Sequence, residues 1–82
     1  MNHDILNAHR FSSWNREQLL TSKYCACFAC LARFTPVKIS EWTDDEQTAV
    51  CPECQVDAVL GSACGVDLTD EFLQRMHEYW FE

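Results

Sequence analysis

The feature that most constrains this chain is a pair of Cys-x2-Cys motifs, Cys27/Cys30 and Cys51/Cys54, separated by 20 residues. A two-residue gap lets both sulfurs of a pair face one ion, and the segment between the pairs is long enough to return the second to the first. This spacing is typical of a structural zinc site, in which four thiolates bind Zn²⁺ at about 2.3 Å. The predicted ligands are therefore Cys27, Cys30, Cys51 and Cys54. Each pair is expected to fold as a tight turn, or knuckle, and Pro52 should stiffen the second knuckle, which contains Cys51 and Cys54.

Two further cysteines leave alternatives open. Cys25 offers a competing Cys-x4-Cys pair with Cys30, although the two-residue gap of Cys27 is the commoner geometry. If Cys27 is the ligand, Cys25 and Cys64 are spare. They are then expected to be buried or partly exposed free thiols. A low-pKa reactive thiol at Cys25, close to Lys23, is the sharper alternative.

Length and compartment favour a metal over disulfides. With 82 residues the chain allows one domain, residues 1–82. A chain of this size has a marginal apolar core and usually needs a metal, disulfides or a partner. No basic segment followed by an apolar run begins the sequence, and no stretch approaches the roughly 18 apolar residues of a membrane span. We therefore expect a cytoplasmic protein with no membrane contact, whose cysteines bind metal in a reducing environment.

The first half of the chain predicts short helices and turns. Residues 3–23 have helical character in two pieces, and Ser12-Ser13 could cap the second piece. Thr35-Pro36 is typical of a helix start, because proline at the first helical position loses no hydrogen bond. We expect one or two helical turns to follow it.

The second half predicts a strand, a short apolar element and a clear helix. Residues 47–50 form the strand that leads into the second knuckle, and residues 55–60 follow that knuckle. Thr69 is the expected N-cap of an amphipathic helix with an apolar stripe at Phe72, Leu73, Met76, Tyr79 and Trp80. The predicted fold is α+β: a small zinc-ribbon or treble-clef core with an N-terminal helical segment and this C-terminal helix. A helix at 55–60 would make it a treble clef, which we slightly prefer, and a strand would make it a ribbon.

Charge argues against a nucleic-acid partner. The net charge is −7, and four thiolates around one Zn²⁺ would bring it to about −9. Binding to phosphates therefore has an electrostatic term of the wrong sign. Three of the six basic residues, Lys23, Arg33 and Lys38, nevertheless flank the first knuckle. They would partly offset the charge of about −2 on the metal centre, and they leave a nucleic-acid-binding zinc ribbon as an alternative.

Catalysis has little support in the residue pattern. A catalytic zinc keeps an open coordination position, and four cysteines leave none. His3, His9 and His77 could complete a mixed site, but none lies at a fixed short spacing from a cysteine, so surface or packing roles are expected. We therefore predict that the chain is not an enzyme, with a zinc- or thiol-dependent enzyme kept as an alternative.

The aromatic residues point to a protein partner. The run Tyr79-Trp80-Phe81 cannot face one side of a helix, so at least one ring is expected to remain available to a partner or to a second copy in a homodimer. Tyrosine and tryptophan are favoured at binding hot spots. The predicted function is a protein-binding or regulatory module, which could inhibit an enzyme or, being acidic, mimic nucleic acid. The alternative is that these rings serve only the chain's own core.

The chain resembles a family of short, uncharacterised bacterial cytoplasmic proteins. The family pattern has an Asn-His helix, Cys-Gly-Cys-Phe-Tyr-Cys, Phe-x-Pro-x-x-Ile-x-x-Trp, Thr-Ala-x-Cys-Pro-x-Cys and a final Tyr-Trp-Phe. The matches are Asn7, His9, Cys25, Cys27, Phe28, Cys30, Phe34, Pro36, Ile39, Trp42, Thr48, Ala49, Cys51, Pro52, Cys54, Tyr79, Trp80 and Phe81. The departures are Ala26 and Gln55 for glycine, Ala29 for tyrosine and Cys64 for serine. The resemblance implies a zinc site and a cytoplasmic location, and it carries no activity.

Overall fold

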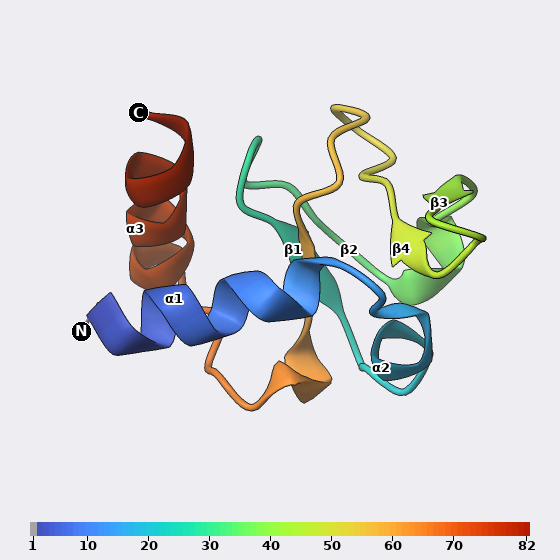
Figure 1. The fold of residues 1–82 in the computed structure, drawn as a ribbon, viewed down its shortest axis with the longest axis horizontal. Coiled ribbons are helices and arrows are strands. Elements are labelled where there is room, and N and C mark those ends of the chain that lie inside the picture. Colours follow the sequence, from blue (N-terminus) through green and yellow to red (C-terminus); the bar gives the residue numbers. More distant parts are fainter. Residues whose placement is uncertain (1) are drawn as a thin grey trace.

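The computed structural model describes residues 2–82, and the side chains from residue 5 onward (Figure 1). Short helices come first, very short strands follow, and a longer helix comes last. The helices are α1 (Asn2–His9), α2 (Arg16–Leu20) and α3 (Asp70–Phe81), and the strands are β1 (Cys25–Cys27), β2 (Arg33–Phe34), β3 (Trp42–Thr43), β4 (Thr48–Ala49) and β5 (Val59–Gly61). Single turns of 3-10 helix cover Arg10–Ser12, Pro36–Lys38 and Ser62–Cys64. This arrangement is the predicted α+β class.

The central sheet decides between the two predicted folds, a ribbon and a treble clef. Its strand order is β2-β1-β5, and β1 is antiparallel to both neighbours, with Cys27 opposite Val59. A separate hairpin is formed by β3 and β4. The segment after the second knuckle contains no helix: residues 55–58 are irregular and Val59–Gly61 form strand β5, so the preference for a helix at 55–60 was wrong. Because β5 pairs with β1 and is buried along its whole length, the core is like that of a zinc ribbon.

The N-terminal segment has the two predicted helical pieces, but not the predicted cap. The hydroxyl of Ser12 donates to the carbonyl of His9 at 2.7 Å, so it serves the end of the first piece. Residue Asn15 occupies the N-cap position of α2, and its side chain makes no capping bond there. Its amide is used elsewhere in the fold.

Asn15 ties this segment to both sheets. It is 3% exposed, and its Nδ2 donates to the carbonyls of Phe11 and Val59, each at 2.9 Å. Its Oδ1 accepts from the N–H of Ala49 at 3.2 Å. One buried amide therefore joins the N-terminal segment, β4 and β5.

The core lies between the central sheet and the helices. Its largest fully buried apolar side chains, each at most 2% exposed, are Phe28, Leu19, Val59, Leu60, Leu68, Leu73 and Met76. Gly61 is enclosed by this packing, since a Cβ there would lie 2.7 Å from Leu19 Cδ2 and would also clash with Ser22 Oγ. Only glycine therefore lets α2 lie this close to the end of β5.

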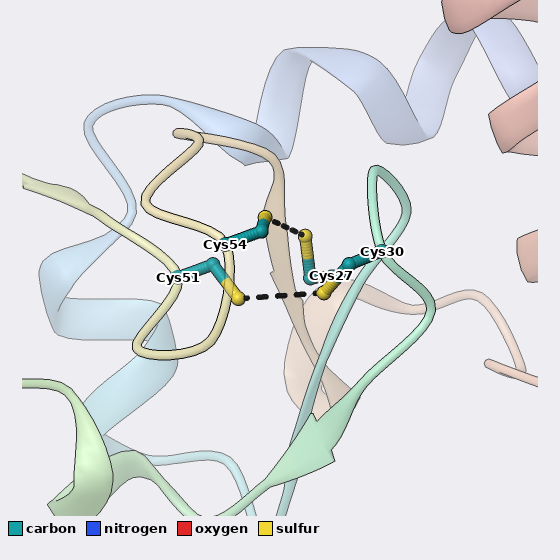
Figure 2. Close-up of side chains that lie close together, drawn as sticks. All are labelled: Cys27, Cys30, Cys51 and Cys54. Carbon is teal, nitrogen blue, oxygen red and sulfur yellow. Dashed lines mark hydrogen bonds between the residues drawn. The ribbon is translucent and has the colours of Figure 1, made fainter.

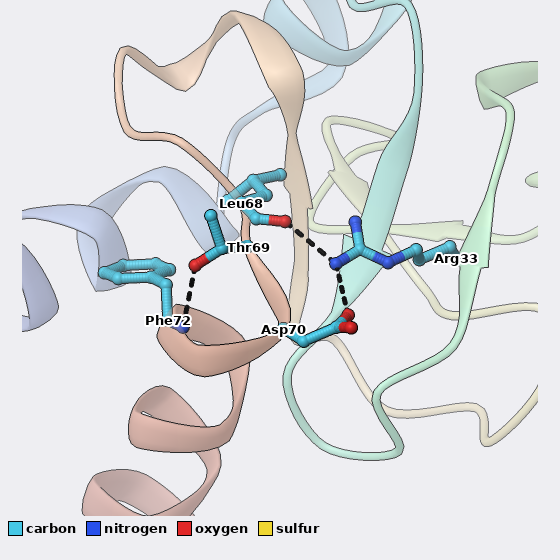
Figure 3. Close-up of polar contacts among 5 residues, drawn as sticks. All are labelled: Arg33, Leu68, Thr69, Asp70 and Phe72. Atoms are coloured by element: carbon cyan, nitrogen blue, oxygen red, sulfur yellow. Dashed lines mark hydrogen bonds and ion pairs between the residues drawn. The ribbon is translucent and has the colours of Figure 1, made fainter.

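Helix α3 begins as predicted and is held to the sheet at its start (Figure 3). The hydroxyl of Thr69 accepts from the N–H of Phe72 at 3.1 Å, which is a side-chain N-cap. From β2, Arg33 donates to Asp70 Oδ1 at 2.8 Å and to the carbonyl of Leu68 at 2.9 Å. The hydrogen bond and charge of Asp70 raise the pKa of Arg33. Figure 1 shows α3 beside α1 at the opposite end of the molecule from the β3–β4 hairpin.

Candidate metal centre

Cys27, Cys30, Cys51 and Cys54 come together as the sequence predicts. Their four sulfurs lie within 4.8 Å of one another, and they are the one group of potential metal ligands found in the described residues. Figure 2 shows the side chains converging from two loops, with Cys27 Sγ 3.7 Å from Cys54 Sγ and Cys30 Sγ 3.7 Å from Cys51 Sγ.

The geometry suits one tetrahedral ion. Metal–sulfur bonds of about 2.3 Å give a tetrahedron whose edges are about 3.8 Å. The two cross-knuckle sulfur distances of 3.7 Å match that edge. Four soft thiolates in this arrangement can hold a metal ion that prefers tetrahedral sulfur, of which zinc and iron are the common biological examples.

The first knuckle is a tight turn that places N–H groups against its sulfur. The N–H of Leu31 donates to the carbonyl of Cys27 at 2.8 Å, and the N–H of Ala29 donates to Cys27 Sγ at 3.3 Å. Leu31 has a left-handed backbone, with φ 67°. Such donors stabilise a thiolate and therefore favour metal binding.

The second knuckle repeats this arrangement. The N–H of Gln55 donates to the carbonyl of Cys51 at 3.0 Å, the N–H of Glu53 donates to Cys51 Sγ at 3.3 Å, and φ of Gln55 is 62°. Gln55 is one of the positions where the resemblance expects glycine. The backbone keeps the left-handed geometry without glycine, at a cost of about 1–2 kcal/mol.

Burial separates the four thiols into two kinds. Cys27 and Cys51 are 0% and 1% exposed, Cys54 is half-buried and Cys30 is exposed. Burial raises the pKa of Cys27, and it also raises that of Cys30. For Cys51 burial alone would raise the pKa, but the N–H groups of Cys54 and Glu53 and the neighbouring thiols lower it overall. Metal binding must therefore displace protons from several of these sulfurs.

Cys25 does not join the group and does not have the surroundings of a reactive thiol. It lies in β1 with no exposed surface, and burial raises its pKa to about 11. This contradicts the alternative of a low-pKa thiol beside Lys23. Cys64 is also buried, and its Sγ donates to the carbonyl of Val66 at 3.7 Å. Both are free thiols, as expected of the spare cysteines.

The histidines serve packing, and the basic residues are partly engaged elsewhere. His9 stacks on Trp80 with 3.9 Å between ring centroids, and His77 Nδ1 lies 3.1 Å from the carbonyl of Phe28. The side chain of His3 lies outside the part that the structure describes. Of the three basic residues near the first knuckle, Arg33 pairs with Asp70 and lies over the ring of Tyr24. Its charge therefore serves the start of α3.

Sequence reasoning missed two contributors to the site. Leu31 follows the first knuckle as Gln55 follows the second, and both have a left-handed backbone. Neither leucine nor glutamine is a residue type that predicts this conformation. Asn15 positions Val59, the strand neighbour of Cys27, from far away in the sequence. The second contribution leaves no local signal, because it exists only when the strands are assembled.

In the described residues, no helix has the length and apolar character needed to cross a membrane. Comparisons of the chain with protein-family models, with curated proteins and with solved structures found no match. The geometry of the site itself shows four converging cysteines on two matching knuckles, which form a group able to hold a metal ion.

Proposed function

We propose that this chain is a small cytoplasmic domain, stabilised by one structural Zn²⁺, that acts by binding another protein. Zinc is the tetrahedral sulfur-bound ion that structural sites of this spacing use most often. Cys27, Cys30, Cys51 and Cys54 would fill its four coordination positions and leave none for a substrate. The proposal therefore gives the metal a role in folding and includes no catalytic activity. We also propose that the chain belongs to the bacterial family that its sequence resembles.

The observation that carries the binding role is the aromatic end of α3, which is formed by Tyr79, Trp80 and Phe81. These three rings are 48%, 37% and 46% exposed. Trp80 is anchored by His9, and Phe81 lies 5.7 Å from the ring of Phe28 in the first knuckle. Large rings that are held in place and still exposed suit a binding hot spot, because little conformational entropy is lost on binding.

Charge on the same helix indicates what kind of partner fits. Exposed Glu78 and Glu82 flank the three rings, and Arg75, one turn earlier, already lies 3.7 Å from Glu71. A partner that presents basic groups to this end of α3 would be electrostatically complementary. Nucleic acid is disfavoured by the net charge of −7. The nucleic-acid-binding alternative is further weakened because Arg33 is already paired with Asp70.

Two measurements test the two halves of the proposal. Native mass spectrometry with and without chelator reports the metal and its number, and it detects a homodimer from the mass. We expect one zinc ion per chain. A chain that binds no metal, or that binds iron instead, would refute the zinc assignment.

The binding half needs a variant that removes a ring without disturbing the core. Tyr79→Ala is suitable because Tyr79 is 48% exposed and its ring meets the ring of Trp80, which is also on the surface, edge to face. Leu20→Ala is the matched control, since Leu20 is 59% exposed and lies on α2, away from α3 (Figure 1). Affinity capture from lysate of the source organism, with zinc-loaded bait at increasing concentration, should yield a saturable protein. Tyr79→Ala should lose most of it and Leu20→Ala should retain it. Equal capture by both variants, or no saturable protein, would count against the proposal.

A further inference from the structure

The four cysteines differ in their access to solvent, and each accessible one has a buried partner. Cys30 is exposed and Cys54 is half-buried, whereas Cys27 and Cys51 are covered. The sulfur pairs at 3.7 Å join Cys30 to Cys51 and Cys54 to Cys27. Both pairs cross from one knuckle to the other, as the dashed lines in Figure 2 show.

This arrangement has the two components of a peroxide-sensitive thiol site. Oxidation by peroxide begins at a solvent-accessible thiolate and is completed when a nearby resolving thiol displaces the oxygen. Cys30 is the exposed cysteine of the group, and Cys51 Sγ lies 3.7 Å from Cys30 Sγ, in place to resolve it. Cys25 and Cys64, by contrast, are buried and outside the group, so they are poorly placed to react first.

We propose that Cys30 is an oxidation site at which a peroxide closes a disulfide with Cys51 and releases the metal. The inference rests on the proposed zinc site. In the first step the Cys30 thiolate attacks a peroxide oxygen, the O–O bond breaks, and the leaving hydroxide takes a proton to become water. The product is a sulfenic acid, Cys30–S–OH. In the second step Cys51 Sγ attacks Cys30 Sγ, the S–O bond breaks, and a second water leaves.

The balance is two thiolates, one hydrogen peroxide and two protons, which give one disulfide and two waters. The sulfurs lose two electrons and the peroxide gains them. Two ligands remain, Cys27 and Cys54, and two thiolates hold zinc far more weakly than four. A second peroxide closes the Cys27–Cys54 pair by the same steps, because those sulfurs also lie 3.7 Å apart.

The pairing across the knuckles has a structural consequence. A disulfide inside one Cys-x2-Cys motif would leave the two loops unconnected when zinc leaves. Cys30–Cys51 and Cys27–Cys54 instead replace the connection between the loops that the metal made. The oxidised chain should therefore keep its knuckles together and be reduced back to a zinc-binding form by a dithiol.

The test uses the wild-type, zinc-loaded protein and substoichiometric hydrogen peroxide. Free thiols are alkylated under denaturing conditions, the chain is digested without reduction, and disulfides are mapped by mass spectrometry. Zinc release is followed with a chromogenic chelator, and dimedone in a parallel sample traps sulfenic acid. We expect dimedone on Cys30, a first disulfide between Cys30 and Cys51, and one zinc released for each first disulfide. The Cys64→Ser variant is the control and should give the same map.

Other outcomes overturn the inference. A first disulfide within a knuckle, first oxidation at Cys25 or Cys64, or zinc that stays bound after the Cys30–Cys51 bridge forms would each contradict it. Failure of the zinc assignment is recognised separately, because metal content is measured before peroxide is added. If the chain carries no zinc, disulfide mapping of the metal-free protein still tests the pairing, and a Cys27–Cys30 bridge there refutes it.

Discussion

Replacing Asn15 with alanine should destabilise the protein more than its position in a connecting segment suggests. The change removes two hydrogen bonds donated at 2.9 Å, to Phe11 and Val59, and one accepted from Ala49 at 3.2 Å. Val59 and Ala49 are both fully buried, so their backbone groups lose a partner that water cannot easily replace. A buried polar group left without a partner costs about 1–3 kcal/mol.

Two such groups, with the third bond and the small cavity, give an expected loss of about 3–5 kcal/mol in the free energy of unfolding. That is far above the loss of about 1 kcal/mol typical of a point substitution. The same change at Asn7, which is exposed on α1, provides the control and should stay within about 0.5 kcal/mol of the wild type.

The assay is urea unfolding followed by far-UV circular dichroism, at one fixed concentration of free zinc for all variants. Zinc is held constant because any ligand of the native state adds to its apparent stability. Asn15→Asp should be at least as damaging, because it keeps an acceptor for Ala49 but places carboxylate oxygen against two carbonyls. A loss below about 1 kcal/mol for Asn15→Ala, with an unchanged dependence on urea, would refute the account of Asn15 as a buried bridge.

Three further predictions concern the metal, a knuckle and the core. A strong chelator should abolish the cooperative unfolding transition, because a structural zinc supplies about 10–16 kcal/mol to domains of marginal stability; a chelated chain with an unchanged melting curve would contradict this. Gln55→Gly should stabilise the zinc-loaded protein by up to about 1 kcal/mol, because φ at Gln55 is 62° and glycine adopts that backbone without strain. Gln55→Ala should not stabilise it. The urea midpoint measures both effects, and equal midpoints for Gln55→Gly and the wild type would count against backbone strain. Gly61→Ala should cost about 1–3 kcal/mol or more, because the new Cβ would lie 2.7 Å from Leu19 Cδ2; a native-like midpoint would show that α2 can move away.

The candidate site was largely predictable because its information is local. A Cys-x2-Cys motif folds as one turn, and the hydrogen bonds that shape it, from Leu31 to Cys27 and from Gln55 to Cys51, span only four residues. The N-cap at Thr69 is similarly local, and it was predicted correctly. Ser12 is the contrasting case, since its hydroxyl could serve either neighbouring helix and it bonds to His9.

Features that depend on contacts between distant segments were harder to predict. Residues 55–60 carry Val56, Val59 and Leu60, which suit a short buried helix as well as a strand. Only its end becomes a strand, Val59–Gly61, because β1 pairs with it, and no local pattern in the sequence predicts that pairing. The choice of Cys27 over Cys25 was predicted from its spacing, whereas the full burial of Cys25 follows from its place in the central strand.

The sequence by itself determined the four converging cysteines, the α+β class and the amphipathic helix α3, because each depends on spacing within a short stretch of chain. Only the tertiary structure decided that the core is like that of a ribbon, that Asn15 joins three segments, and that Cys30 lies exposed opposite a buried Cys51. Those properties arise from how distant segments pair and pack, and from which surfaces that packing leaves uncovered. In a chain this small, the two cysteine knuckles are themselves among the segments that the packing brings together.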